Sequence, residues 1–326
     1  MSIKPVLPDM DRLRELYARY RHLLVAERPE LDQRLLAGNM VHAPCFLDIA
    51  AGFDCILFDA YGVLNRGPVA IAGAVATLAR LRQMGKRFFL VSNNACLSPP
   101  QVLTQLRGMG FDLEEQEIVT SGMVIKSAVA NSRFQGQPYC LVGTHASALA
   151  YAPQPERLMV NFSPSGEARS DMDWRQAAYI VLCSDVEYYG GPQQRLVETL
   201  LAERVRPLLM ANPDLVAPNS QGSNIWVSGL TVFSLEVRFG LPWIGLGKPF
   251  APVFELALER VGNVPRERIL MVGDTLETDV LGGTAMGFAT CLTLSGVLSE
   301  YRGSLTDLCI QRGIRPDYLV DSIAAR

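Results

Sequence analysis

Four polar side chains in this sequence are of the types that phosphoryl transfer requires. They are two carboxylates, a hydroxyl and an ammonium group, at Asp59, Ser92, Lys248 and Asp274. A carboxylate can attack phosphorus, a second carboxylate can hold a divalent cation, and hydroxyl and ammonium groups can bind the phosphate oxygens. The four positions are far apart along the chain, so this chemistry depends on a fold that brings them together.

Three of these residues lie just after short apolar segments. Such segments, bounded by polar turns, are typical of central strands in a parallel sheet, and they cover residues 55–58, 87–91 and 268–272. Helical stretches separate them, at residues 73–84, 98–109 and 251–261. Alternating strands and helices predict an α/β fold with a Rossmann-like, doubly wound parallel sheet, in which ligands bind at the carboxyl ends of the strands.

The length of 326 residues favours two domains, or one domain with a large insertion. Residues 125–235 contain short apolar segments and loops rich in Pro, Gly, Ser and Asn, so we interpret them as a smaller inserted α/β domain. Residues 51–124 and 236–326 then form the core domain. Residues 1–50 form an N-terminal helical extension, in which residues 9–24 have the apolar spacing of an amphipathic helix.

Composition excludes several classes of function. The net charge of −3 provides no overall basic field for nucleic acid or for a membrane surface, and no apolar run approaches the ~20 residues that span a bilayer. We recognise no signal peptide at the N-terminus. The seven cysteines are scattered without a Cys-x-x-Cys pair, which favours a reducing cytoplasm, and three histidines are too few for a His-rich metal site.

The chemical residues belong to four segments that together resemble the motifs of the haloacid dehalogenase superfamily. In chain order these are Asp59-Ala60-Tyr61-Gly62-Val63-Leu64, Val91-Ser92-Asn93-Asn94, Gly247-Lys248-Pro249 and Gly273-Asp274-Thr275-Leu276-Glu277-Thr278-Asp279. The long insertion between the second and third motifs resembles the class IIA branch, which includes nitrophenyl-phosphatase-like and pyridoxal-phosphatase-like enzymes. The resemblance implies that residues 125–235 form a C2-type cap over the site. Caps of this class often pair subunits, so it also implies a homodimer.

The resemblance also implies roles for individual residues. The catalytic residues would be the nucleophile Asp59, with Ser92 and Lys248. The groups that bind phosphate would be the backbone N–H groups of Gly62, Val63 and Asn93, the Ser92 hydroxyl and Lys248. Mg²⁺ would be held by Asp59, Asp274 and the backbone carbonyl of Tyr61, with Asp279 in support. Substrate contacts from the cap would come from Asn212, Asp214 and Asn224, in a polar stretch that also includes Asn219, Gln221 and Ser223.

Tyr61 departs from the family pattern. Phosphatases of this family have a second aspartate at this position, which protonates the leaving oxygen and then activates the hydrolytic water. Such general acid–base catalysis contributes ~10²–10⁴-fold, and a tyrosine with an ordinary pKa of ~10 is a poor base at neutral pH. The substitution therefore argues against fast turnover, while the backbone carbonyl of Tyr61 can still ligate a cation.

We expect a Mg²⁺-dependent hydrolase that acts on a small phosphorylated metabolite through an aspartyl-phosphate at Asp59. Turnover should be slow or restricted to good leaving groups. One alternative is a phosphometabolite-binding protein with little or no turnover. Another alternative is a metal-independent 2-haloacid dehalogenase, because Asp59-Ala60-Tyr61-Gly62 also resembles the first motif of those enzymes. Without a metal, however, Asp274 and Asp279 would crowd the nucleophile with negative charge.

Overall fold

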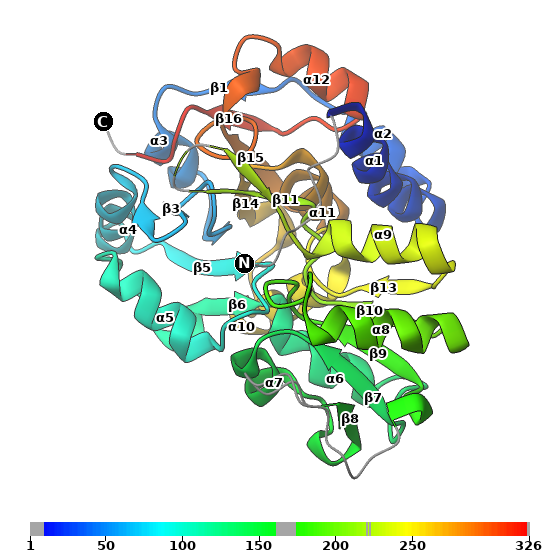
Figure 1. The fold of residues 1–326 in the computed structure, drawn as a ribbon. Helices are drawn as coiled ribbons and strands as arrows, with labels where there is room; N and C mark the ends of the chain where they lie inside the picture. Colours follow the sequence, from blue (N-terminus) through cyan, green and yellow to red (C-terminus); the bar gives the residue numbers. More distant parts are fainter. Residues whose placement is uncertain (1–9, 161–173, 220, 222, 325–326) are drawn as a thin grey trace.

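The computed structural model describes residues 10–160, 174–219, 221 and 223–324. Its two main sheets lie one beyond the other in Figure 1, with the core sheet above and the sheet of the insert below. No helix in the described part of the chain combines the length and the apolar character needed to cross a membrane.

The core sheet has seven strands, and all its neighbouring strands are parallel. From edge to edge they are β1 (Val41–His42), β16 (Tyr318–Val320), β15 (Ala289–Thr293), β14 (Ile269–Gly273), β2 (Cys55–Phe58), β5 (Arg87–Ser92) and β6 (Ile118–Thr120). From the central β2 the chain builds first toward β6 and later toward β16. This reversal of strand order leaves a crevice at the carboxyl ends of the central strands.

Helices cover both faces of this sheet because its strands alternate their side chains between two apolar layers. Ile56 and Phe58 of β2 face one layer, and Cys55 and Leu57 face the other. The first layer is completed by α3 (Phe46–Ala51), α4 (Ala74–Gln83) and α5 (Pro99–Gly108). The second is completed by α10 (Ala251–Val261) and the end of α11 (Leu281–Met286). The expected doubly wound fold is confirmed, with strands and helices within one or two residues of their predicted bounds.

The insert forms a second parallel sheet with its own helices. Its strands are β13 (Trp243–Gly245), β10 (Leu208–Met210), β9 (Tyr179–Leu182), β7 (Tyr139–Val142) and β8 (Leu158–Val160). Its helices are α6 (Ile125–Ala130), α7 (His145–Tyr151), α8 (Pro192–Glu203) and α9 (Ser228–Phe239). The remaining strands form two short antiparallel hairpins outside the two main sheets. One pairs β3 (Asn65–Arg66) with β4 (Val69–Ala70), and the other, in the insert, pairs β11 (Val216–Pro218) with β12 (Asn224–Trp226).

The sheet of the insert extends past the boundary that the sequence suggested. We assigned residues 236–326 to the core, but β13 pairs with β10, with Trp243 beside Leu208 and Gly245 beside Met210. The pairing is made by backbone groups, so the apolar side chains of this short strand do not reveal which sheet it joins.

The N-terminal extension contributes to both halves of the molecule. It consists of α1 (Met10–Glu27), α2 (Glu30–Leu35) and the edge strand β1. One continuous apolar cluster joins α1 and α2 to the insert, through residues such as Phe233, and to the core, through residues such as Leu292. The last helix, α12 (Leu305–Arg312), packs into the same cluster. The two sheets are thus connected by packing as well as by the chain.

Candidate active site

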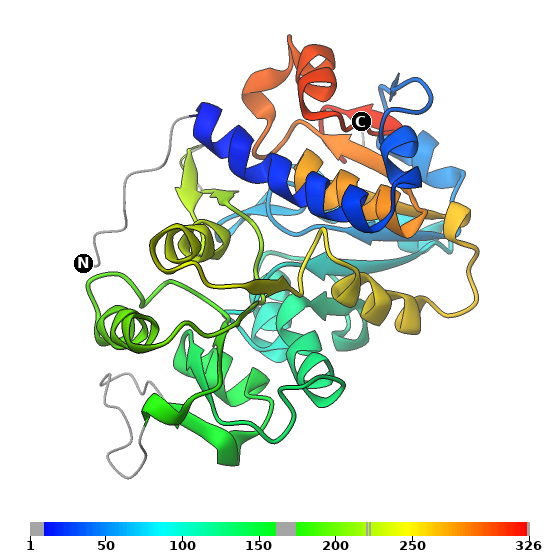
Figure 2. The same ribbon diagram turned by 90° about the vertical axis from the view of Figure 1, so that its right-hand side faces the viewer.

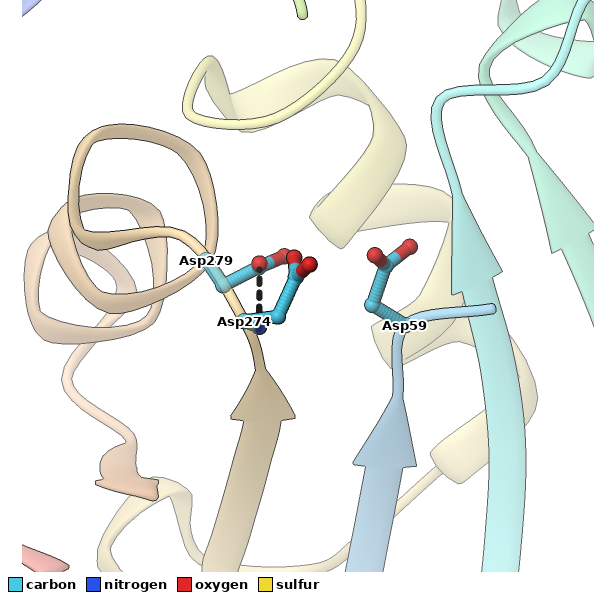
Figure 3. A group of neighbouring side chains, drawn as sticks. All are labelled: Asp59, Asp274 and Asp279. Carbon is cyan, nitrogen blue, oxygen red and sulfur yellow. Dashed lines mark hydrogen bonds between the residues drawn. The ribbon is translucent and has the colours of Figure 1, made fainter. Parts of the chain in front are cut away.

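Three carboxylates meet at the carboxyl ends of the two central strands. Asp59 directly follows β2, Asp274 directly follows β14, and Asp279 lies in the helical turn Leu276–Val280 that comes next. One oxygen from each lies within 4.8 Å of the others. Figure 3 shows the three side chains pointing into the same space beyond the strand ends. The fold thereby gathers the acidic residues of the first and fourth motifs.

Lys248 joins this cluster as its cation. Its Nζ lies 2.7 Å from Oδ1 of Asp59 and 2.7 Å from Oδ1 of Asp279, and its side chain is 1% exposed. Burial alone would lower the pKa of Lys248, but Asp279, Asp59 and Asp214 raise it above its ordinary value. Lys248 is therefore charged at neutral pH, and it holds the Asp59 carboxylate in place.

A single lysine does not balance three carboxylates. Burial raises the pKa of Asp59 to about 6 against the opposing effect of Lys248, and burial, Asp59 and Asp279 raise the pKa of Asp274 well above its ordinary value. A divalent cation would relieve this repulsion, and carboxylate oxygens are the ligands that Mg²⁺ prefers. The donor set thus fits a divalent cation such as Mg²⁺, which the carboxylates of Asp59 and Asp274 could hold.

Asp274 is held rigidly where a ligand is needed. Its Oδ2 accepts the N–H of Val297 at 2.7 Å, and its Oδ1 accepts the Thr275 hydroxyl at 3.0 Å. Two glycines leave the space that the carboxylate fills, because a Cβ atom would lie 1.9 Å from Oδ2 at Gly62 and 1.8 Å from it at Gly296. Such close packing pre-organises the carboxylate before any ligand binds.

Asp279 contacts Lys248 and the backbone beside Asp274. Its Oδ1 contacts Lys248, and its Oδ2 accepts the backbone N–H groups of Asp274 and Thr275, both at 3.2 Å. The backbone carbonyl of Tyr61 accepts no hydrogen bond from the described residues, so it is free to ligate a cation.

The groups expected to bind phosphate differ in whether their hydrogen-bond donors are already used within the protein. Ser92 ends β5, is buried, and its hydroxyl oxygen accepts the N–H of Asn94 at 3.3 Å, which leaves its O–H proton to donate. Within the described chain, the N–H groups of Val63 and Asn93 have no acceptor. The expectation for Gly62 needs correction, because its N–H donates to the Asn65 carbonyl at 2.8 Å. The turn into the β3–β4 hairpin uses this N–H.

Tyr61 is poorly placed to replace the missing aspartate. Its side chain packs beside the apolar layer that contains α5, and Gln105 lies near enough to lower the pKa of its hydroxyl. Burial is the largest cause that raises the pKa of Tyr61, and the nearby Cys96 and Asp59 raise it further, against the opposing effect of Gln105. The hydroxyl therefore stays protonated at neutral pH and cannot act as the general base.

Asn93 has a structural role that the sequence did not reveal. Its Oδ1 accepts the backbone N–H of Lys248 at 2.7 Å. Its Nδ2 donates to the Lys248 carbonyl at 3.1 Å and to Oδ1 of Asp214 at 2.9 Å. One core side chain therefore fixes both the backbone of the lysine and a carboxylate from the insert. The residue type alone carries no signal for such a bridge.

Of the three residues expected to reach the site from the cap, the structure connects only Asp214 to it by a described contact. Asp214 reaches the site through Asn93, remains half-buried, and has its pKa raised to about 7 by burial despite the nearby Lys248. Asn212 instead shapes the turn, since its Oδ1 accepts the Asp214 N–H at 2.9 Å. Asn224 lies in β12, and within the described chain no contact joins its side chain to the cluster.

The described residues in the rest of the polar stretch form hydrogen bonds with one another. Oδ1 of Asn219 accepts the N–H groups of Gln221 and Ser223, and its Nδ2 donates to the Ser223 hydroxyl, which makes the tip of the β11–β12 hairpin. His145, at the start of α7, is exposed.

Comparisons with known proteins identify the family of this chain. A haloacid dehalogenase-like hydrolase model matches residues 56–151, and a HAD-hydrolase-like model matches residues 245–325. A glycerol-3-phosphate phosphatase from Gallus gallus is 33% identical over 320 residues, which cover 89% of this chain and 95% of that relative. The chain therefore belongs to the haloacid dehalogenase-like hydrolases. The expected class IIA resemblance is confirmed, and the chain is an enzyme of this superfamily.

Solved structures show the same architecture. A possible sugar phosphatase of this superfamily from Cytophaga hutchinsonii is 25% identical, with a TM-score of 0.72, and covers 88% of this chain and 100% of its own. A glycerol phosphate phosphatase from Mycobacterium tuberculosis, solved in complex with magnesium, is 25% identical with a TM-score of 0.64, and covers 84% of this chain and 76% of its own. The core with its inserted cap is thus a shared architecture.

Proposed function

We propose that this chain is a Mg²⁺-dependent phosphatase that hydrolyses a small phosphate ester or anhydride through an aspartyl-phosphate at Asp59. One observation carries this proposal: Asp59, Lys248 and Asp274 meet in a single cluster at the carboxyl ends of β2 and β14. The names of the relatives support a small phosphorylated substrate, and the magnesium complex of one of them supports the choice of cation. We place the enzyme in a reducing compartment, the cytoplasm.

In the first step, the residues of this chain bind and attack the phosphoryl group. The Ser92 hydroxyl, the N–H groups of Val63 and Asn93, and the Lys248 ammonium donate to the phosphate oxygens. A carboxylate oxygen of Asp59 forms a bond to phosphorus while the bond from phosphorus to the leaving oxygen breaks. When bound, Mg²⁺ would neutralise charge between the carboxylates and the phosphate.

In the second step, a water oxygen bonds to phosphorus and the bond from phosphorus to Asp59 breaks, which releases phosphate and restores the carboxylate. Both steps need proton transfer, first to the leaving oxygen and then from the water. Tyr61 stays protonated and cannot take the proton of the water. We therefore infer that the second step is slow and that the aspartyl-phosphate accumulates.

Trapping the phosphoenzyme tests this function. Acid quenching after mixing with nitrophenyl phosphate and Mg²⁺ should give a phosphorylated peptide that contains Asp59, together with a burst of nitrophenol. Asp59→Asn should remove both signals, and a chelator should do the same to the wild type. Nitrophenol release that survives the chelator would overturn the proposal in favour of a metal-independent hydrolase.

A phosphometabolite-binding protein with little turnover is the second candidate. The observation that favours it is Tyr61, whose raised pKa leaves the site without an identified base. Mg²⁺-dependent binding of a phosphate ester without any phosphoenzyme, in the same quench experiment, would select this role.

A further inference from the structure

Helix α1 lies across the boundary between the insert and the core. In Figure 1 it lies beside α9 of the insert and α11 of the core, and Figure 2 shows it running lengthwise over this side of the molecule. Arg19 forms two hydrogen bonds of 2.7 Å with the Glu236 carboxylate of α9, and Arg21 donates to the Gly313 carbonyl of the core at 3.1 Å. The helix is therefore anchored to both halves.

Two tyrosines of α1 hold the segment that carries Asp214. The Tyr20 hydroxyl donates to the Pro213 carbonyl at 2.6 Å, and the Leu215 N–H donates to the Tyr17 hydroxyl oxygen at 3.3 Å. Both tyrosines are buried, and Tyr20 has no exposed surface. The backbone on each side of Asp214 is thus fixed by a hydroxyl group from the N-terminal helix.

The opposite side of the same segment rests on α9. The Gly229 N–H donates to the Asp214 carbonyl at 2.9 Å, and a Cβ atom at Gly229 would lie 2.4 Å from the Pro213 carbonyl oxygen. The segment is therefore clamped between two helices, with little room to shift while both contacts hold.

A continuous set of contacts leads from this clamp to the nucleophile. Asp214 accepts from Asn93 at 2.9 Å, Asn93 accepts the Lys248 N–H at 2.7 Å, and Lys248 contacts Asp59 at 2.7 Å. A change in the position of Asp214 alters the partner of Asn93, and Asn93 is what fixes the backbone of Lys248. The position of the ammonium group beside Asp59 then depends on contacts that begin in α1.

We propose that Tyr17 and Tyr20 are positioning residues for the reaction at Asp59, acting through Asp214, Asn93 and Lys248. This inference rests on the proposed function. It makes α1 part of the catalytic unit rather than a packing extension, because the two hydroxyl groups, and not only the aromatic rings, determine the geometry of the site.

Tyrosine-to-phenylalanine variants test the role of the hydroxyl groups, since they keep the rings that pack in the apolar cluster. We expect Tyr20→Phe and Tyr17→Phe each to lower the rate of phosphoenzyme formation about 2- to 13-fold, as the net worth of about 0.5–1.5 kcal/mol for one hydrogen bond implies, with KM changed less than twofold. Tyr188→Phe is the matched control, because Tyr188 is buried and its hydroxyl has no partner among the described residues. It should leave the rate unchanged.

A double-mutant cycle separates positioning from general destabilisation. If Tyr20 acts through Asp214, Tyr20→Phe should have little further effect on phosphoenzyme formation in an Asp214→Ala background, where no side-chain oxygen at this position can accept from Asn93. Equal effects in both backgrounds, or Tyr→Phe variants as fast as the wild type, would overturn the inference.

Amide hydrogen exchange provides a readout that does not depend on turnover. Exchange over residues 211–217 should be faster in Tyr17→Phe and Tyr20→Phe than in the wild type, and unchanged in Tyr188→Phe. A wild type that forms no phosphoenzyme would refute the proposed function, and the exchange data would still decide whether α1 holds this segment. Unchanged exchange in both variants would overturn the inference by itself.

Discussion

An alanine at position 296 should disable the cation site without altering any charged group. The Cβ atom would lie 1.8 Å from Oδ2 of Asp274, and Cβ contacts below 3.0 Å are essentially not found in proteins. Asp274 must therefore move by about 1.2 Å or more, and its bond from the Val297 N–H must break. The new methyl group cannot shift away from Asp274 instead, because the Cα atom of Gly62 lies 2.6 Å from the same Cβ position.

A displacement of this size exceeds the tolerance of a metal site, where distances hold to about 0.2 Å. Changes in groups that merely orient a ligand cost about 10–100-fold in metal affinity, so we expect Gly296→Ala to weaken Mg²⁺ binding about 100-fold or more. Isothermal titration calorimetry measures this directly and does not require turnover. Gly303→Ala is the matched control, because a Cβ atom there meets no atom within 4 Å.

The result that would refute this reasoning is equally direct. If Gly296→Ala binds Mg²⁺ within twofold of the wild type, Asp274 is not a ligand held by close packing. Thermal melts of both glycine variants without Mg²⁺ show whether the alanine also affects the fold, since only a local effect leaves the melting temperature close to that of Gly303→Ala.

Three further predictions follow from the same cluster. Tyr61→Asp should raise the turnover of alkyl phosphates by about 10²–10⁴-fold, measured as steady-state phosphate release. The turnover of nitrophenyl phosphate should rise less. Unchanged turnover of both substrates would mean that another group transfers the proton. Lys248→Met leaves Asp59 and Asp279 without their buried counter-charge, so we expect urea unfolding to show a loss of about 3–5 kcal/mol, partly recovered when Mg²⁺ is added. Burial raises the pKa of Asp214 from 3.8 to about 7, so the folded state binds this proton more tightly and the group's contribution to stability falls as the pH rises from about 4 to 7. Asp214→Asn should remove that part of the pH dependence of unfolding, and an identical pH profile would contradict the assignment.

The sheet and the acidic cluster were predictable because both depend on local pattern. A short apolar run that ends in a polar residue identifies a buried strand and its carboxyl end, and this placed Asp59 and Asp274 at the same edge. The roles of Gly62 and β13 were not predictable in this way. Each depends on which backbone group pairs with a given N–H or carbonyl, and side-chain patterns carry little information on that choice.

Contacts between distant segments were equally hidden. The apolar spacing of residues 9–24 predicted a buried helix face, and Tyr17 and Tyr20 are buried as a result. Their hydroxyl groups find partners in a segment near residue 214, and no local signal connects the two. Asn93 was expected to offer only its backbone, while its side chain makes the connection between Asp214 and Lys248.

The edge strand β1 also has a consequence for how the chain is made. It precedes every other strand of the core sheet, yet its neighbour there is β16. During synthesis β1 therefore emerges from the ribosome long before β16, its neighbour in the sheet. The sheet cannot be completed at this edge until residues 318–320 have emerged. A recombinant fragment that starts near residue 56 would leave β16 as an open edge, ready to pair with other chains.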